Sequence, residues 1–282
     1  MLKRIYIFSP LRLHRGGILL GMLAVLSLLT ACTTMPYSPP ATPITLELAP
    51  TGKLRAAINF GNPILAVKDS TTGQPRGVSV DLARELGSRL GVPVELITFE
   101  AAGKVVEAVK ATQVDIAFVA IDPVRDADML QTPPYVIIEG AYLVRNASPI
   151  KSNAEVDRPG NRIAVGNGSV YDLHLTREVK AATLLRASTS PTVVDFFLAQ
   201  GLEVAAGVKQ QLQADAKRLT GLRLLDGRFM VIQQAMGLPK GREAGAKYLT
   251  AFVEEMKASG FVASALAEHG IVGAAVAARA QP

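Results

Sequence analysis

The chain has 282 residues, of which 49% are hydrophobic, with 30 basic and 24 acidic side chains and a net charge of +6. The apolar fraction is sufficient for a packed core, which excludes global disorder, and the length suits one large or two medium domains. The single cysteine excludes an internal disulfide framework and a metal site built from several cysteines. With three histidines a His-rich metal cluster is not expected, and we predict no cofactor.

The basic character is concentrated at the N-terminus. Residues 1–31 contain Lys3, Arg4, Arg12 and Arg15 and no acid, whereas the remaining residues contain 26 bases and 24 acids. The body of the protein therefore lacks the basic field that a nucleic-acid partner requires, and we expect no binding of nucleic acid.

An apolar run, Ile18 to Leu29, follows the basic segment. Its 12 residues suit the core of a signal peptide, because a membrane-spanning helix needs about 20. The run ends in Leu29-Thr30-Ala31-Cys32, which resembles a bacterial lipobox, the motif whose cysteine receives lipid. We therefore predict that residues 1–31 are a lipoprotein signal peptide and that Cys32 is lipidated. An uncleaved anchor helix with a buried cysteine is the alternative.

Residues 32–50 contain four prolines between Met35 and Pro43. Such a segment is typical of an extended tether without a fold of its own. Several acyl chains on one residue hold a protein stably on a membrane, so we expect a periplasmic, lipid-anchored protein. Thr33, which is not an aspartate, permits delivery to the outer membrane by resemblance to Gram-negative sorting, and the inner membrane remains open.

From Gly52 onward, strand-like and helix-like segments alternate. The segment Ser79–Leu90 has leucines at helical spacing, Ser79 as its predicted N-cap and Gly91 as its stop. The apolar run Val114–Ile121 is typical of a buried parallel strand. The other elements expected in the first half are strands over Leu54–Phe60, Val94–Thr98 and Tyr135–Val144, and a helix over Lys104–Thr112.

The second half repeats this alternation. Ser169 and Asp172 predict the start of one helix, Ser190-Pro191 predicts the start of another, and Gly201 ends it. The remaining expected elements are strands over Arg162–Val165, Val204–Gly207 and Phe229–Met236, and helices over Val208–Leu219 and Arg242–Ser259. Strands separated by helices predict an α/β fold with mostly parallel sheets. Residues 271–282 are expected to form a flexible tail.

Several segments resemble solute-binding protein family 3, the amino-acid-type substrate-binding proteins of bacterial ABC transporters. The matching pieces, in order along the chain, are GKLRAAINF, VDLARELGSRLGV, VDIAFVAIDPVR, PPY, RIAVGNGSVYD and YLTAFVEEMKASGFVASAL. They cover about residues 51–270, and the lipobox agrees with them independently.

The resemblance implies a two-lobed periplasmic-binding-protein fold of type II, with two crossover strands as the hinge and the ligand held between the lobes. Lobe 1 is then expected over residues 51–140 plus 232–270, and lobe 2 over 141–231. It further implies a monomer that captures a carboxylate-bearing solute, either an amino acid or a related organic anion, and delivers it to an ABC transporter permease.

Arg125 is the first candidate for ligand binding. It follows a predicted strand where the family usually has Thr-x-x-Arg, whose arginine grips the ligand carboxylate, and its guanidinium fork matches a carboxylate bidentately. Asp122 stands where the family prefers threonine. The alternative is a surface arginine paired with Asp122, Asp126 or Asp128.

The second candidate is the glycine turn Gly166-Asn167-Gly168-Ser169, which lies between a predicted strand and a predicted helix. Such a turn directs backbone N–H groups and the helix dipole toward an anion. We expect Gly168 and Ser169 to contact the ligand, and Val170 and Tyr171 to lie at the rim. A plain N-cap at Ser169 is the alternative.

Residues from the first lobe complete the expected site. The loop from Asn59 to Leu65 is expected to form its wall, with Phe60 either stacking on the ligand or lying in the core. Ala120 and Ile121, at the end of the central strand, are expected to meet the ligand through their backbone.

Lys209 departs from the family, whose α-amino-acid binders usually place an acid near this position. A lysine there would repel a ligand ammonium, which predicts an anion without an α-amino group. An offset in the alignment is the alternative, with Lys209 solvated and Glu203 or Asp195 supplying the acid.

No enzymatic motif of the hydrolase, zincin or nucleotide-binding kind is present, so we do not expect an enzyme. Two other functions remain open. One is a periplasmic lyase of the cyclohexadienyl-dehydratase kind, with Glu100, Asp122 or Glu139 as its acid. The other is a ligand-binding lobe that signals to a membrane receptor.

Overall fold

The computed structural model describes residues 42–281. The predicted signal peptide and the predicted lipidation of Cys32 therefore concern residues outside the described range. Within 42–281, no helix has both the length and the apolar character needed to cross a bilayer.

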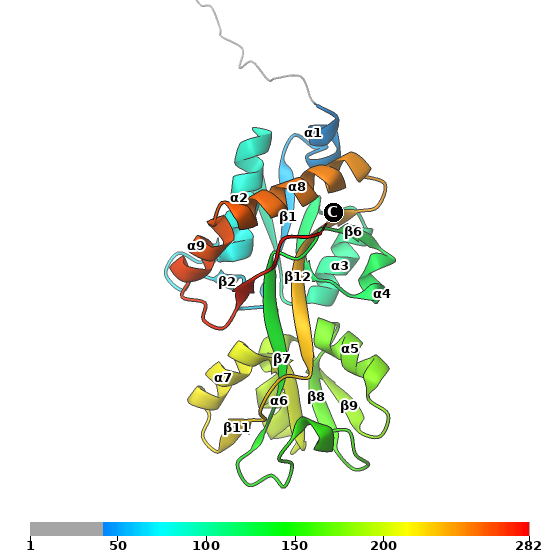
Figure 1. The fold of residues 1–282 in the computed structure, drawn as a ribbon, viewed down its shortest axis with the longest axis vertical. Coiled ribbons are helices and arrows are strands. Elements are labelled where there is room, and N and C mark those ends of the chain that lie inside the picture. Colours follow the sequence, from blue (N-terminus) through cyan, green and yellow to red (C-terminus); the bar gives the residue numbers. More distant parts are fainter. Residues whose placement is uncertain (1–41, 282) are drawn as a thin grey trace, which may run out of the picture. The chain divides into compact units, whose positions relative to one another are not determined.

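One curled sheet of eleven strands runs through the described residues, with the central order β4-β1-β5-β12-β7-β10-β8-β9 (Figure 1). β6 pairs with β12, and β11 and β13 pair with β7. The strands are β1 Leu54–Asn59, β4 Val94–Phe99, β5 Ile116–Ala120, β6 Met129–Gln131, β7 Val136–Arg145, β8 Arg162–Gly166, β9 Thr183–Ala187, β10 Val204–Val208, β11 Leu222–Leu224, β12 Met230–Pro239 and β13 Ala275–Val276. β2 Val67–Lys68 and β3 Pro75–Arg76 form a separate hairpin.

The helices cover the faces of this sheet. They are α1 Pro43–Leu48, α2 Val78–Leu90, α3 Ala102–Lys110, α4 Pro123–Asp126, α5 Val170–Glu178, α6 Val193–Ala199, α7 Lys209–Arg218, α8 Glu243–Ala258 and α9 Phe261–Glu268, with short 3-10 turns η1 Asn153–Glu155 and η2 Ser190–Thr192. The alternation of strands and helices confirms the predicted α/β class.

β7 and β12 are the crossover strands. Each has ten residues, and they pair antiparallel with Met230 opposite Gly140 and Gln234 opposite Val136. β12 joins β5 on one side, and β7 joins β10 on the other, both also antiparallel. The predicted parallel pairing is therefore confined to the strands flanking the crossover pair, namely β4-β1-β5 and β10-β8-β9.

Two lobes lie at the two ends of the crossover strands (Figure 1). In the first lobe, Ile58 of β1 belongs to the core that α2, α8 and α9 cover, whereas the adjacent Ala57 belongs to the core on the other face, which α3 covers. In the second lobe, Ala205 of β10 faces one core and Ala206 faces the other. This alternation follows from the two-residue period of a strand, and it buries both faces of each half of the sheet.

Three expectations were wrong, concerning the start of helix α2, the unfolded tether and the flexible tail. Helix α2 begins after Gly77, two residues before the predicted N-cap Ser79. Position 77 requires glycine, because its φ is +130° and a Cβ there would lie 2.4 Å from the Leu65 carbonyl oxygen. Ser79 is instead buried in the first helical turn, 3.4 Å from the Tyr135 hydroxyl. The other two differences concern the tether and the tail.

Part of the predicted tether, residues 32–50, is folded. Thr42 caps helix α1, Leu48 is fully buried, and the Glu47 carboxylate accepts a 2.6 Å hydrogen bond from the Gly245 amide. The predicted tail, residues 271–282, contains β13, which pairs with β7, and Ala277 is buried behind it. Short apolar segments of this kind gain order from tertiary packing, which local composition does not report.

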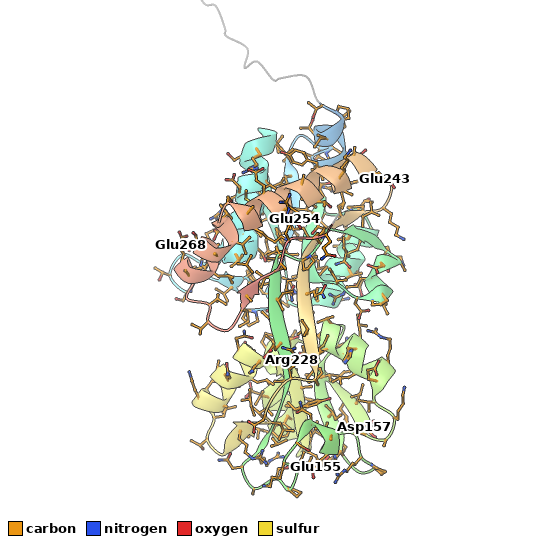
Figure 2. All side chains as sticks on the ribbon, in the orientation of Figure 1. Glu155, Asp157, Arg228, Glu243, Glu254 and Glu268 are labelled. Carbon is orange, nitrogen blue, oxygen red and sulfur yellow. The ribbon has the colours of Figure 1, made fainter. Side chains whose placement is uncertain are left out.

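Asp157 holds two loops of the second lobe together (Figure 2). Its two carboxylate oxygens accept hydrogen bonds of 2.8 Å from the backbone amides of Lys180, Ala181 and Ala182, just before β9. These bonds, that from Ala182 foremost, lower the pKa of Asp157 below its ordinary value of 3.8. The stabilisation is therefore fully present above the ordinary pKa and is lost as the pH falls through the lowered one.

We expect Asp157→Asn to reduce the free energy of unfolding by about 1–2 kcal/mol at pH 7, since an amide offers one acceptor oxygen in place of two charged ones. The difference from the unmodified protein should shrink below pH 4, which urea unfolding at pH 7 and pH 3 would measure. Asp226→Asn, at an exposed position, is the control. An equal difference at both pH values would contradict the role of the charge.

Candidate functional site

A small cavity lies where the two lobes meet. Its volume is about 30 Å³, enough for one or two water molecules, so a solute of several heavy atoms requires the lobes to part. Both lobes and a crossover strand line it, through Asn59, Gly61, Asn62, Ala102, Ala120, Arg125, Ser169, Val170, Tyr171, Ser190, Val208 and Gln234.

Arg125 is the charged group of this cavity. It lies on α4, whose N-cap Asp122 accepts a 2.9 Å hydrogen bond from the Val124 amide. The Arg125 side chain is 2% exposed, and its guanidinium donates to the Ala120 carbonyl at 2.7 Å and to the Gly168 carbonyl at 3.1 Å. Burial lowers the pKa of Arg125 to about 10, against the opposing charge of Asp122, so the guanidinium remains charged at neutral pH.

The surface pairing considered for Arg125 is not found. Asp122 instead accepts bonds of 2.7 and 3.2 Å from Arg177 of the second lobe, and Asp128 pairs with Lys110 at 2.9 Å. Among the described residues, no carboxylate is hydrogen-bonded to Arg125. A guanidinium has five donors, so most of its donors remain for a bound anion.

The glycine turn forms the wall of the second lobe. Gly168 has φ +68°, and a Cβ there would lie 3.2 Å from the Cα of Gly103 in the facing lobe. Ser169 caps α5 by accepting from the Asp172 amide at 3.0 Å, as predicted, and it also lines the cavity. Gly168 contributes its carbonyl to Arg125 but is not among the lining residues.

Tyr171 is buried, not at a rim. Its side chain is 2% exposed and its hydroxyl has no hydrogen-bond partner of normal geometry among the described residues, while burial raises its pKa. A Cβ on Gly166 would lie 2.7 Å from both this hydroxyl and the Ser190 hydroxyl. Glycine at position 166 thus leaves the space into which both hydroxyls project.

The first-lobe wall matches the prediction in part. Asn59 lines the cavity and accepts a 2.9 Å bond from the Gly61 amide, and the buried Oδ1 atom of Asn62 has no partner within residues 42–281. Ala120 lines the cavity too. Phe60, however, packs on the first-lobe core, and Ile121 uses its amide to pair with Gln233.

Lys209 is not brought to the cavity. Its ammonium donates to Glu139 of β7 at 2.8 Å, and Arg228 donates to the other oxygen of the same carboxylate at 2.7 Å. These two cations, Lys209 first, lower the pKa of Glu139. The acids considered in its place are also occupied elsewhere, Glu203 by Arg162 and Asp195 by Arg218.

Sequence reasoning missed Ser190, Val208 and Ala102. Ser190 was assigned only to the start of a helix, and Val208 only to the start of the next one. Ser190 is the first residue of η2 and Val208 is the last residue of β10. Both line the cavity from the second lobe. Position at the carboxyl end of a parallel strand is the signal that would have indicated Val208.

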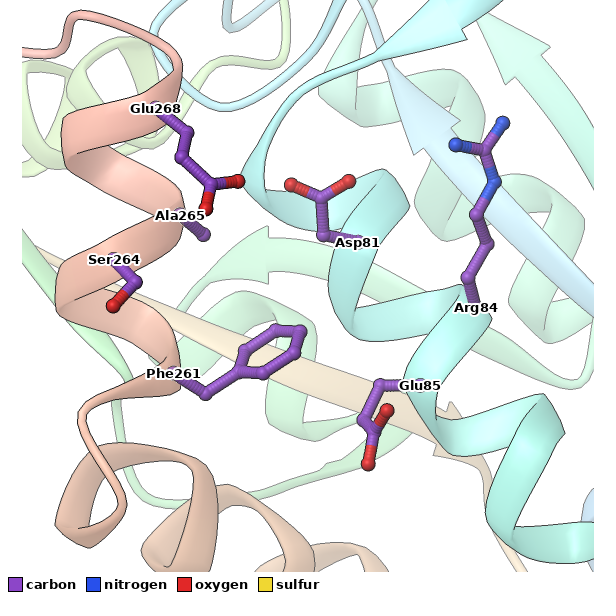
Figure 3. A pocket seen from close by; sticks show the side chains of 7 residues that line it. All are labelled: Asp81, Arg84, Glu85, Phe261, Ser264, Ala265 and Glu268. Carbon is purple, nitrogen blue, oxygen red and sulfur yellow. The ribbon is translucent and has the colours of Figure 1, made fainter.

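A larger cavity, of about 390 Å³, lies between α2 and α9 of the first lobe (Figure 3). The carboxylates of Asp81 and Glu268 face each other across it. Asp81 already pairs with His269 at 2.6 Å, and Glu85 with Arg89 at 2.8 Å. This groove belongs to one lobe, whereas the cavity around Arg125 joins both, so we assign the candidate site to the latter.

The comparisons with known proteins agree with this architecture. Residues 54–270 match the model of the bacterial extracellular solute-binding proteins, family 3, and the chain belongs to that family. No curated protein matches the chain.

Three solved structures show the same two-lobed fold. A putative binding component of an ABC transporter from Wolinella succinogenes, complexed with lysine, is 22% identical, with a TM-score of 0.68 over 79% of this chain and 97% of that one. An amino acid ABC transporter substrate-binding protein from Streptococcus pneumoniae, bound to L-arginine, is 17% identical, with a TM-score of 0.69 over 81% and 98%. The ancestral amino-acid-binding protein AncCDT-1, a precursor of cyclohexadienyl dehydratase, is 22% identical, with a TM-score of 0.67 over 79% and 96%.

The ion pair between Asp122 and Arg177 links the two lobes. The Asp122 side chain is 2% exposed and that of Arg177 is 39% exposed. Removal of Arg177 leaves a buried carboxylate without its cation, which costs more than loss of an exposed pair.

We expect Arg177→Ala to lower the free energy of unfolding by about 1–3 kcal/mol and to favour the open arrangement of the lobes. Chemical unfolding and the radius of gyration from small-angle scattering would measure the two effects. Arg158→Ala, which removes an exposed arginine 3.7 Å from Glu155, is the control within the second lobe. Identical behaviour of the two variants would show that the interlobe pair contributes nothing.

Proposed function

We propose that this protein is a lipid-anchored, periplasmic solute-binding protein. It captures a small carboxylate-bearing solute between its two lobes and delivers that solute to an ABC transporter permease. Residues 51–140 with 232–270 form lobe 1 in this proposal, and residues 141–231 form lobe 2.

The observation that carries the proposal is Arg125. A buried guanidinium that donates to two carbonyl oxygens, and to no carboxylate among the described residues, has its charge compensated only in part, by the nearby Asp122 that also pairs with Arg177. Burial of such a charge is costly, and a bound carboxylate would compensate it with bidentate hydrogen bonds. Its place between the lobes means that the same contact would favour closure.

Closure provides the signal for delivery. Arg125 and Asp122 of the first lobe already contact Gly168 and Arg177 of the second. A ligand that binds both lobes would shift the population toward the closed arrangement by its differential affinity for the two arrangements. A permease that recognises the closed surface would then distinguish loaded from empty protein.

We propose binding without turnover. The three acids considered for a lyase, Glu100, Asp122 and Glu139, are not among the residues that line the cavity. In addition, Asp122 is paired with Arg177, and Glu139 is paired with Lys209 and Arg228. The residues that do line it offer hydroxyl, amide and guanidinium groups, which suit recognition.

We expect Arg125→Met to weaken binding of the solute by about 10- to 150-fold, which corresponds to loss of a charge-assisted bond worth roughly 1.5–3 kcal/mol. Titration calorimetry of the full-length chain in mild detergent, against amino acids, dicarboxylates, keto acids, aromatic acids and polyamines, would measure the affinity. Arg84→Met, at an exposed position on α2, is the control. An undiminished affinity in Arg125→Met would contradict the proposal.

We expect Cys32→Ser to abolish the lipid anchor, because a hydroxyl does not replace the thiol that lipidation requires. The variant should lose incorporation of labelled palmitate, which metabolic labelling and gel autoradiography would measure. Solute affinity should not change, since the cavity lies within residues 59–234. Labelled lipid retained on the variant would show that residue 32 is not the attachment point.

A further inference from the structure

The charges around the cavity between the lobes are unbalanced. Of its lining residues, Arg125 is charged, and the others are asparagine, glutamine, serine, tyrosine and small apolar residues. A ligand with a carboxylate and an ammonium group would find a partner for the first and no acid for the second.

The acids on nearby elements are already neutralised by other cations. Asp122 is held by Arg177, Asp172 by Arg186 at 3.0 Å, and Glu139 by both Lys209 and Arg228. Asp172 also accepts from the Gly168 amide at 3.0 Å, which directs it into its own lobe. Freeing any of these carboxylates would leave an arginine or a lysine without its partner.

Within residues 42–281, the buried Oδ1 atom of Asn62 is a neutral acceptor of the cavity lining that has no partner. The Tyr171 hydroxyl is also buried and lines the cavity beside the hydroxyls of Ser169 and Ser190, and a hydroxyl can turn its proton toward a ligand. A ligand hydroxyl could donate to the first or accept from the second, which an unsubstituted alkyl chain cannot do. An ammonium would also donate to the amide oxygen, but its charge would remain close to the buried guanidinium and repel it.

We infer that the cavity binds a small hydroxyl-bearing monocarboxylate without an ammonium group, with the carboxylate on Arg125 and the hydroxyl near Asn62 and Tyr171. This inference rests on the proposed function and narrows its solute class to hydroxy acids.

Val208 is the residue at which this preference can be reversed. It is the last residue of β10, lines the cavity and occupies the N-cap position of α7 without a side-chain hydrogen bond. Val208 is 8% exposed, so a charge there carries a burial cost, and the N-cap position offsets part of that cost because an aspartate can accept from the first amides of α7. Val208→Asp thereby adds a carboxylate to the cavity wall. Val208→Asn adds the same shape without the charge, and circular dichroism would verify that both variants are folded.

The experiment compares matched triplets of ligands on the full-length chain in mild detergent. Each triplet has one carbon skeleton bearing a hydroxyl, a hydrogen or an ammonium at the α carbon, namely lactate, propionate and alanine; 2-hydroxyisovalerate, isovalerate and valine; and phenyllactate, phenylpropionate and phenylalanine. Calorimetry gives the dissociation constants. We expect at least one hydroxy acid to bind 30-fold or more tightly than its amino acid, with the unsubstituted acid between them.

We further expect Val208→Asp to lower the ratio of the dissociation constant of the amino acid to that of the hydroxy acid, or to bring it below one. Val208→Asn should leave the preference for the hydroxy acid in place. A change of the ratio in both variants alike would overturn the role of charge at this wall. Equal binding of the hydroxy and unsubstituted acids would overturn the roles of Asn62 and Tyr171.

The outcomes also separate this inference from the proposed function. If an amino acid binds as tightly as its hydroxy acid and Arg125→Met abolishes the binding, the inference is wrong and the proposed function stands. If none of the nine acids binds, and none of the wider panel of carboxylates does, both are overturned.

Discussion

The antiparallel pairing of β7 with β12 is the constraint on which the rest of the molecule depends. Two ten-residue strands, in register from Gly140 and Met230 to Val136 and Gln234, extend the sheet into both lobes. Each flanking set of parallel strands then ends at the same region, because carboxyl ends of parallel strands share one edge. Ala120 ends β5 and Arg125 follows it on α4, Ser169 follows β8, and Val208 ends β10. The site is therefore a consequence of strand order, and both lobes contribute to it.

Arg125 connects this architecture to binding. Its guanidinium spans from the Ala120 carbonyl of its own lobe to the Gly168 carbonyl of the other, so the group that we propose binds an anion is also a contact between the lobes. The close approach of Gly103 and Gly168 accompanies this contact, and a Cβ at position 168 would lie 3.2 Å from the Cα of Gly103, so a side chain there would press the two backbones apart. Binding and closure thus share atoms, and a change in one carries an energetic consequence for the other.

The sequence predicted the α/β class, most strands and helices and the cap at Ser169, because these follow from periodicity and local capping patterns. The position of Arg125 in the cavity was expected only from the resemblance to the family. Prediction from the sequence failed for α1 and β13, which are ordered by long-range contacts such as that of Glu47 with Gly245 and the pairing of Ala275 with Ile137. Of the two places left open for Phe60, the core is the one observed. Ile121 and Lys209 were expected at the ligand, whereas the Ile121 amide pairs with Gln233 and the Lys209 ammonium with Glu139, because both partners come from distant elements. Asn62 lies in the loop that was expected to form the wall, and Val208 ends a parallel strand, whereas no local pattern distinguishes Ser190 from an ordinary residue at the start of a helix.

The electrostatic character of the cavity shows why such pairings matter for specificity. From the sequence, a pairing of Asp122 with Arg125 was one expectation, and contact of Lys209 with the ligand was another. In the folded protein Asp122 pairs with Arg177, Lys209 pairs with Glu139, and the hydrogen bonds of the Arg125 guanidinium go to carbonyl oxygens. Arg125 is therefore the charged group that lines the cavity, with the charge of Asp122 close enough to raise its pKa. Because Lys209 is paired with Glu139 outside the lining, it gives no information about a ligand ammonium, and the proposal that an ammonium is disfavoured rests instead on a lining that offers no acid among the described residues.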